Sequence, residues 1–351
     1  MNGDLKHSTA GDAPRSEAEL EELLSAPDGE VVAAMGALEG DVLVLGGGGK
    51  IGPALARMAR QASDEAGAKR RVTSVSRFTQ AGLRQRLQDD GIETVACDLL
   101  DPAAIAALPE AANVVFMAGM KFGTSGAAAA AWATNCYLPA LVCRKFTRSR
   151  VVAFSTGNVY GLTPVVRGGS VESDQPNPLG DYAMSALGRE RMFEHFSRTL
   201  DIPVAMLRLN YATELRYGVL VDLARGVQAG HAIDLTMGYV NVIWLAEANA
   251  MALKAFAHAA SPPLVVNVSG PETLSVRRAC GELGRLLGRE PVLSGGESPD
   301  ALLSNGELGF GLLGRPRMSA DEMIRWTAHW LERGGPLLEK PTHFQVRDGK
   351  F

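Results

Sequence analysis

The sequence predicts an α/β protein: a parallel, doubly wound sheet of the Rossmann type, with a smaller C-terminal substrate-binding lobe and an N-terminal helical extension. One observation is the apolar run Val42–Leu45, which breaks into glycines before a helical pattern begins near Pro53. A second is that further apolar runs, at 71–76, 93–97, 113–117, 150–156 and 204–210, alternate with helical segments. Such alternation is typical of parallel strands joined by crossover helices.

The glycine turn is the centre of this prediction. Its glycines satisfy two spacings, Gly46-x-x-Gly49-x-x-Gly52 and Gly47-x-Gly49-x-x-Gly52. Glycines here would let backbone amides at a helix N-terminus approach a pyrophosphate. We therefore expect Gly46, Gly49, Lys50, Ile51 and Gly52 to bind a dinucleotide. A flexible turn between ordinary elements is the alternative, and the spacing does not choose among nucleotide-binding families.

The ends of the next strands bear on the choice of cofactor. NAD-binding folds usually place an acidic side chain after the second strand, whereas this chain has Ser76 and Arg77, which suit a 2′-phosphate. NADP is therefore the preferred cofactor, and NAD remains possible. Asp98 and Leu99 follow the third strand, where the acid could accept a hydrogen bond from the adenine amino group or simply cap a helix.

Composition excludes several classes of protein. The chain of 351 residues carries 35 Lys and Arg against 39 Asp and Glu, so it has no basic field for nucleic acid or an anionic membrane. Its four cysteines form no Cys-x-x-Cys pair, so we expect reduced thiols and no metal site. Because no signal peptide or membrane-spanning run is evident, we expect a cytoplasmic protein.

Four regions are expected along the chain. Residues 1–40 form an arm and a helical extension, in which Ser16 and Glu19 fit a capping box. Residues 41–210 form the dinucleotide-binding domain, and 211–333 form mainly the substrate-binding lobe with late elements of the sheet. Residues 334–351 form a polar tail that could fold over a pocket or a partner subunit.

Several of these motifs together resemble the extended short-chain dehydrogenase/reductase family, also called the NAD-dependent epimerase/dehydratase family. They are the glycine turn, Asp98-Leu99, Ala118-Gly119, Asn135, Ser155-Thr156 before Val159-Tyr160-Gly161, Glu172 before Pro178, Tyr182 leading to Glu190, and Asn267-Val268-Ser269-Gly270 before Leu274-Ser275-Val276. The resemblance extends from about Asp41 to Leu331. It implies that Ala118 and Gly119 border the cofactor.

The resemblance also implies catalytic roles. Tyr182 matches the family's acid/base and Thr156 its substrate-holding hydroxyl, but Ala186 stands where the family has a lysine. A phenol is a poor base near neutrality without a neighbouring cation. Lys121 is our preferred substitute. Arg189 lies two helical turns after Tyr182, a long way for direct contact, and a third possibility is that hydride chemistry has been lost.

The substrate is expected to be a sugar or sugar acid, and Asn158, Asn210 and Arg216 are its predicted contacts. The arginine that holds the diphosphate in nucleotide-sugar enzymes is missing near Met237–Trp244, and Arg208, Arg216 or Arg225 could replace it. No Asp-Glu pair follows Thr156, which disfavours 4,6-dehydration.

These expectations combine into one function and one alternative. The function is an NAD(P)-dependent oxidoreductase or epimerase acting by hydride transfer on a sugar or sugar-acid hydroxyl. The alternative is a catalytically inert dinucleotide-binding sensor or scaffold protein. The resemblance further implies a homodimer formed through the helices at 127–146 and 182–198.

Overall fold

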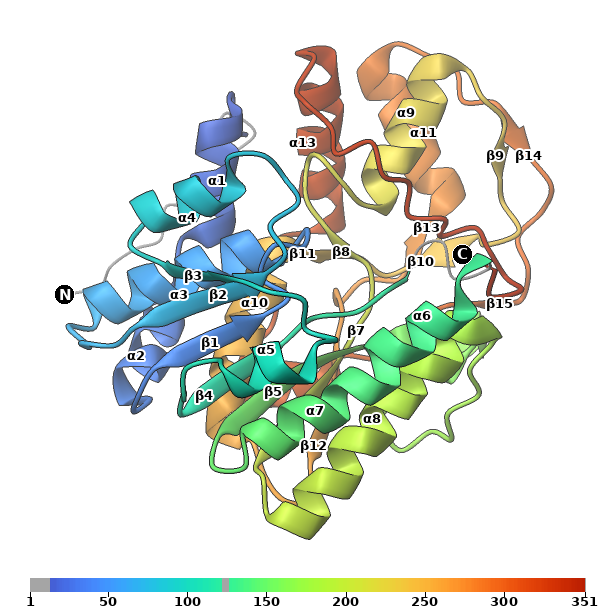
Figure 1. Cartoon of the computed structure of the whole chain (residues 1–351). Coiled ribbons are helices and arrows are strands. Elements are labelled where there is room, and N and C mark those ends of the chain that lie inside the picture. The colour runs from blue at the N-terminus through green and yellow to red at the C-terminus, as the bar shows by residue number, and fades with distance from the viewer. Residues whose placement is uncertain (1–12, 122–125, 351) are drawn as a thin grey trace.

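The structure is a computed structural model, and it describes residues 13–121 and 126–350. Within these ranges one large sheet is formed by parallel strands (Figure 1). In spatial order they are β12 (Leu264–Val268), β7 (Val204–Leu209), β5 (Arg150–Thr156), β4 (Asn113–Phe116), β1 (Val42–Leu45), β2 (Val72–Ser76) and β3 (Glu93–Ala96). The chain moves outward from β1 to β3 and then returns to β4 on the other side of β1. This reversal opens a crevice at the carboxyl ends of β1 and β4, where such folds bind ligands.

Helices cover both faces of the sheet, which explains why the strands are apolar throughout. In β1, Val42 and Val44 pack on one face and Leu43 and Leu45 on the other. The first face is covered by α2 (Gly29–Ala37), α3 (Gly52–Glu65) and α10 (Leu245–Lys254). The second is covered by α5 (Pro102–Ala106), α7 (Leu138–Lys145) and α8 (Gly180–Leu200). The predicted doubly wound α/β fold is confirmed.

The N-terminal extension is helical, as expected. The Ser16 hydroxyl caps α1 (Glu17–Ser25) by accepting from the Glu19 amide. The Glu19 carboxylate accepts from the Arg15 amide at 2.7 Å, so the capping box lacks its usual return bond to the cap residue. Leu20 and Leu24 join the apolar core of the C-terminal lobe, and α2 packs on α3 and α10. Most of the arm predicted before Ser16 lies outside the described residues.

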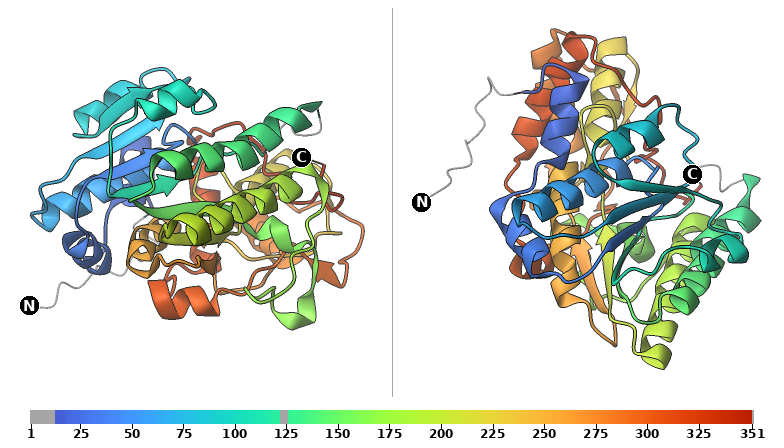
Figure 2. Two further views of the ribbon diagram at one scale, coloured as in Figure 1. Left: turned by 60° about the horizontal axis from the view of Figure 1, so that its bottom comes forward. Right: turned by 60° about the vertical axis from the view of Figure 1, so that its left-hand side comes forward.

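The helix predicted over 127–146 is interrupted. It consists of α6 (Ala128–Trp132), a π-helical turn (Ala133–Tyr137) and α7. A π turn inserts one extra residue into the helical ladder and often occurs at functional sites. Here it contains the fully buried Asn135. Figure 2 shows that α6, α7 and α8 lie side by side.

The C-terminal lobe lies above the carboxyl edge of the sheet in Figure 1. Its helices are α9 (Val219–Ala229), α11 (Val276–Leu287) and α13 (Ala320–Glu332). Four short strand pairs lie outside the large sheet: β8 (Ala212–Thr213) with β11 (Ile243–Trp244), β9 (Ile233–Asp234) with β14 (Leu293–Ser294), β10 (Tyr239–Val240) with β13 (Leu274–Ser275), and β6 (Thr163–Pro164) with β15 (Asp300–Ala301). The remaining helices are α4 (Leu83–Asp89) and α12 (Glu307–Leu313).

The tail after α13 folds back across this lobe. The Leu338 amide donates to the Arg216 carbonyl at 3.0 Å, and Thr342 donates twice to the Asp222 carboxylate. These bonds hold the segment between them against the crevice. The sequence left open whether the tail folds over a pocket or over a partner subunit. In the structure it folds over a pocket of its own chain.

The described residues contain no helix long and apolar enough to cross a bilayer. A search of the same residues finds no group of three His, Cys, Asp or Glu side chains placed to hold a metal ion. The four cysteines are free thiols.

Candidate active site

The glycine turn lies against its neighbours so closely that side chains would not fit. A Cβ atom on Gly46, where φ is +90°, would lie 2.6 Å from the Ala118 amide nitrogen, and one on Gly52 would lie 2.5 Å from the Gly47 Cα. The turn opens α3, whose N-cap residue, Ile51, makes no side-chain capping bond. Exposed amides at the start of a 14-residue helix are well suited to phosphate groups. The backbone therefore fits a dinucleotide.

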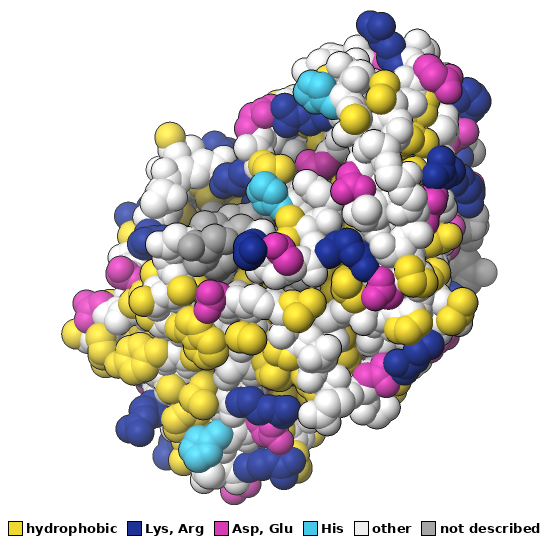
Figure 3. All heavy atoms as spheres, turned by 90° about the vertical axis from the view of Figure 1, so that its right-hand side faces the viewer, with side chains coloured by type: hydrophobic (Ala, Val, Ile, Leu, Met, Phe, Trp, Pro, Cys, Tyr) yellow, Lys and Arg dark blue, Asp and Glu magenta, His cyan; other side chains and the backbone are white. Residues whose placement is uncertain are grey.

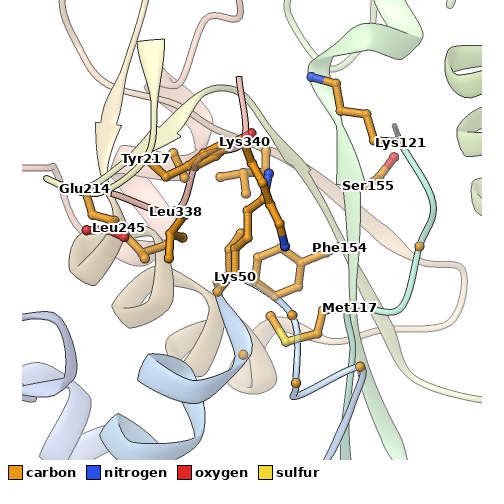
Figure 4. Close-up of a pocket in the computed structure, with 18 of the residues that line it drawn as sticks. Lys50, Met117, Lys121, Phe154, Ser155, Glu214, Tyr217, Leu245, Leu338 and Lys340 are labelled. Carbon is orange, nitrogen blue, oxygen red and sulfur yellow. The ribbon is translucent and has the colours of Figure 1, made fainter. Parts of the chain in front are cut away.

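A cavity of about 450 Å³ lies over this turn. Figure 4 shows its residues, which come from the turn, from the loop after β4, from β5, from the C-terminal lobe and from the tail. Of the predicted site residues it contains Gly46, Gly49, Lys50, Ile51, Gly52, Gly119, Lys121 and Tyr182.

Lysines from three separate segments line the cavity. Lys50 and Lys340 both extend into it in Figure 4, and Lys121 lines it as well. The Lys50 Nζ lies 3.6 Å from the centre of the Tyr217 ring. Burial, followed by the charges of Lys340 and Lys121, lowers the pKa of Lys50 to about 7. Burial lowers the pKa of Lys121 to about 8. This concentration of positive charge favours an anionic ligand.

The predicted hydroxyl pair is assembled at the edge of the cavity. Thr156 ends β5 and is buried, and its Oγ1 accepts from the Asn158 amide at 3.2 Å and from Asn158 Nδ2 at 3.0 Å. Tyr182, in the first turn of α8, lies close enough to Thr156 for the Thr156 hydroxyl to lower the pKa of its phenol. Burial raises the pKa of the Tyr182 phenol, while the Arg189 charge and the Thr156 hydroxyl oppose that rise.

The adenine-side residues lie outside this cavity. Ser76 nevertheless lies beside the glycine turn, because a Cβ on Gly48 would come within 2.4 Å of its Oγ. Arg77 and Asp98 are exposed, and the Asp98 carboxylate accepts from the Leu100 amide, a local turn bond. Leu99 is buried.

The three predicted substrate residues are not brought to this cavity. Asn158 lines a different, smaller pocket and supports Thr156. Asn210 is buried, and its amide donates to Asn241 at 2.6 Å. Arg216 forms ion pairs with Glu214, Glu17 and Glu21. For Asn210 and Arg216 the structure thus shows polar partners within the protein.

Sequence reasoning missed part of the cavity wall. Leu338 and Lys340 arrive from the tail, Tyr217 comes from the lobe, and Phe154 and Ser155 come from β5. Nothing in the tail sequence identifies Lys340, since its position depends on the bonds of Leu338 and Thr342 to residues more than 100 positions earlier. Ser155 could have been predicted as a site residue, because it directly precedes Thr156 at the end of a strand.

With this geometry established, the chain can be compared with known proteins. Residues 42–213, just under half of the chain, match the model of the NAD dependent epimerase/dehydratase family. A search of the curated proteins found no match.

Solved epimerase/dehydratase structures share the fold. UDP-glucose 4-epimerase of Thermotoga maritima, solved with UDP-glucose, superposes with a TM-score of 0.68 at 17% identity, covering 84% of this chain and 99% of its own. UDP-glucuronic acid 4-epimerase of Bacillus cereus, solved with NAD, gives 0.68 at 16% identity, covering 84% and 96%. DesIV, a dTDP-glucose 4,6-dehydratase of Streptomyces venezuelae solved with NAD, gives 0.70 at 19% identity, covering 83% and 97%. At these identities the likeness establishes the fold.

Proposed function

We propose that this protein is an NAD(P)-dependent oxidoreductase or epimerase that acts by hydride transfer on a hydroxyl of a sugar or sugar acid. The observation that carries the proposal is that Tyr182, which lies near Thr156, lines the same cavity as the glycine turn. An alcohol and a phenol beside a dinucleotide cradle can hold a substrate oxygen and exchange its proton.

In this proposal each residue has one role. Thr156 orients the reacting oxygen, and Tyr182 takes or returns its proton. Lys121, whose Nζ lies 5.7 Å from the centre of the Tyr182 ring, adds positive charge on that side of the phenol. A bound nicotinamide would accept or donate the hydride. Sugars, sugar acids, their lactones and nucleotide-linked sugars, each assayed with NAD and NADP by the absorbance of the reduced nicotinamide, test the proposal.

The second candidate function is the inert dinucleotide-binding sensor or scaffold. Ala186 favours it, because this side chain is fully buried against Val159 and Tyr160 and supplies no cation. Binding of the dinucleotide without turnover of any sugar would support this second function.

Cofactor preference gives the first testable prediction. Two of the solved structures described above, DesIV and the Bacillus cereus epimerase, contain NAD. In this chain the exposed Arg77 after β2 suits the 2′-phosphate of NADP. We expect Arg77→Ala to weaken NADP binding about tenfold or more, as for loss of a charge-assisted hydrogen bond, and to change NAD binding little. Equal losses for both cofactors, measured by fluorescence titration, would refute the preference for NADP.

The lowered pKa of Lys50 gives a second prediction. Free Lys50 is mostly neutral at pH 8, because its pKa is about 7. A bound pyrophosphate favours the ammonium, so binding should take up a proton and affinity should fall as the pH rises above 7. Calorimetry in buffers of different ionisation enthalpy measures this uptake. Lys50→Met should reduce it, leaving the part due to Lys121, and Lys145→Met, which removes an ion pair with Glu110 outside the cavity, should leave it unchanged.

We also propose that two copies of the chain pair through α6, the π turn and α8. Large hydrophobic side chains are exposed there, namely Trp132, Tyr137 and Met184. Figure 3 shows hydrophobic side chains gathered on the lower part of the face that it displays. A mass near 37.2 kDa in light scattering, the mass of one chain, would contradict the dimer.

A further inference from the structure

The cation missing at position 186 has a candidate replacement one turn further along α8. Side chains on a helix point back toward its N-terminus, so a long side chain at position 189 extends past Ala186 toward the turn that holds Tyr182. The Arg189 side chain is buried and lines the same cavity as Tyr182. Because the Ala186 side chain ends at its Cβ, no longer side chain at position 186 stands between Arg189 and the turn that holds Tyr182.

The Arg189 guanidinium is fixed by two hydrogen bonds. Its Nη1 donates to the Phe154 carbonyl at 2.7 Å, and its Nη2 donates to Asn135 Oδ1 at 2.5 Å. A Cβ on Gly119 would come within 2.5 Å of Nη2, so the guanidinium lies directly against a glycine of the cavity wall. Its Nε is buried without a hydrogen-bond partner among the described residues. An incompletely satisfied charge therefore lies immediately behind the site.

Asn135, which lies in the π turn, holds the Arg189 guanidinium as part of a wider hydrogen-bond network. Its amide nitrogen donates to the Met120 carbonyl at 3.0 Å and to Ser185 Oγ at 2.9 Å, while its oxygen also accepts from the Met120 amide at 3.1 Å. The Ser185 hydroxyl in turn donates to the Tyr182 carbonyl at 3.0 Å. Asn135 thus links Arg189, the loop after β4 and the first turn of α8 into one network.

We propose that Arg189 is the positioning cation that stabilises ionised Tyr182 in place of the lysine that Ala186 replaces. The inference rests on the proposed function. In substrate oxidation, ionised Tyr182 would take the proton from the substrate hydroxyl oxygen, and a bound nicotinamide would supply the acceptor for the hydride from the carbon that carries this oxygen. Negative charge on Tyr182 before this step requires a nearby positive charge.

Two comparisons favour Arg189 over Lys121 for this role. The Arg189 charge lowers the pKa of Tyr182 against the larger, opposing effect of burial. Burial lowers the pKa of Arg189, but a guanidinium starts from a higher pKa than an amine, whereas burial brings the pKa of Lys121 to about 8. The Lys121 Nζ lies over the Tyr182 ring, 5.7 Å from its centre. The other ionisable groups near this pair are Tyr217 from the lobe and, facing Arg189, Cys136 and Glu190.

The test measures the ionisation of residue 182 directly. Difluorotyrosine, a phenol that ionises at lower pH than tyrosine, is placed at position 182, and its titration midpoint is read from phenolate absorbance. Arg189→Gln keeps a donor and removes the charge. We expect the midpoint to rise by about 1 pH unit or more. Arg189→Lys should give a smaller rise, and adding Ala186→Lys to Arg189→Gln should restore the midpoint toward its original value.

The controls separate a charge effect from damage to the fold. Arg191→Gln removes an exposed cation of the same helix, paired with Glu194, and should leave the midpoint unchanged. If Arg189→Gln does not fold, Asn135→Asp neutralises Arg189 with a side chain of the same shape and should also raise the midpoint. A midpoint equal to that of the parent protein in the variant that folds overturns the inference. A shifted midpoint in a protein that turns over no sugar would leave the inference standing and refute the proposed hydride transfer.

Discussion

Replacing Tyr182 with phenylalanine should lower the turnover number about 10²- to 10⁴-fold, the usual contribution of a positioned general acid or base. The change removes one hydroxyl, the group whose pKa Thr156 lowers, and leaves the ring in place. The ring and the glycine turn both remain. The dissociation constant of the dinucleotide should therefore stay within about twofold of its original value, which is well below a tenfold change, or about 1.4 kcal/mol of binding free energy.

Steady-state kinetics and a fluorescence titration of the cofactor measure these two quantities separately. Tyr239→Phe is the matched control, because Tyr239 lies in β10, outside the cavity. Equal turnover in the Tyr182 and Tyr239 variants would eliminate the assigned proton transfer. A protein that binds the dinucleotide and turns over no sugar before any substitution would indicate the inert sensor instead.

Replacing Glu190 with alanine should lower the free energy of unfolding by about 3–5 kcal/mol, the cost of leaving one member of a buried ion pair alone. Arg208 Nη2 and Nε donate to the two Glu190 oxygens at 2.7 and 3.0 Å, and the two side chains are 5% and 2% exposed. Ser155 also donates to Glu190 at 2.5 Å. The pair therefore anchors the end of β5 next to Thr156.

Denaturant unfolding measures this loss, and α8 supplies its own control. Glu194 pairs with Arg191 and Arg198 on the exposed side of the helix, so Glu194→Ala should cost only about 0–1 kcal/mol. Replacing Glu190 with leucine and Arg208 with methionine together should recover most of the stability, since no buried charge is then left unpaired. Similar losses for Glu190→Ala and Glu194→Ala would show that the buried pair does not stabilise the fold.

Much of the fold could be predicted because its signals are local. A continuous apolar strand such as Val42–Leu45 marks a sheet covered on both faces, and the glycines after it mark a turn closer than any side chain allows. The Ser16 cap likewise depends on residues within one helical turn. The interruption over 133–137 was missed because nothing local in an alanine-rich helix marks a π turn.

The residues of the candidate site also differ in whether a local sequence signal could identify them. Thr156 and Tyr182 were identified because their neighbours in the sequence carry a family pattern, and the structure brings their hydroxyls together. Arg216 was chosen as a cation suited to a substrate, but its carboxylate partners Glu17 and Glu21 lie nearly 200 residues earlier and could not be anticipated.

The sequence by itself determined the α/β class and the glycine turn, and it suggested Thr156 and Tyr182 as the reacting residues, since each of these signals depends on spacing within a short segment. Only the tertiary structure decided which charges surround that pair. Lys340 reaches the cavity through tail bonds to the distant lobe, and Arg189 is fixed through Asn135 on another helix. The physical reason is that electrostatic effects depend on distance and burial in the folded molecule, which separation along the chain does not specify.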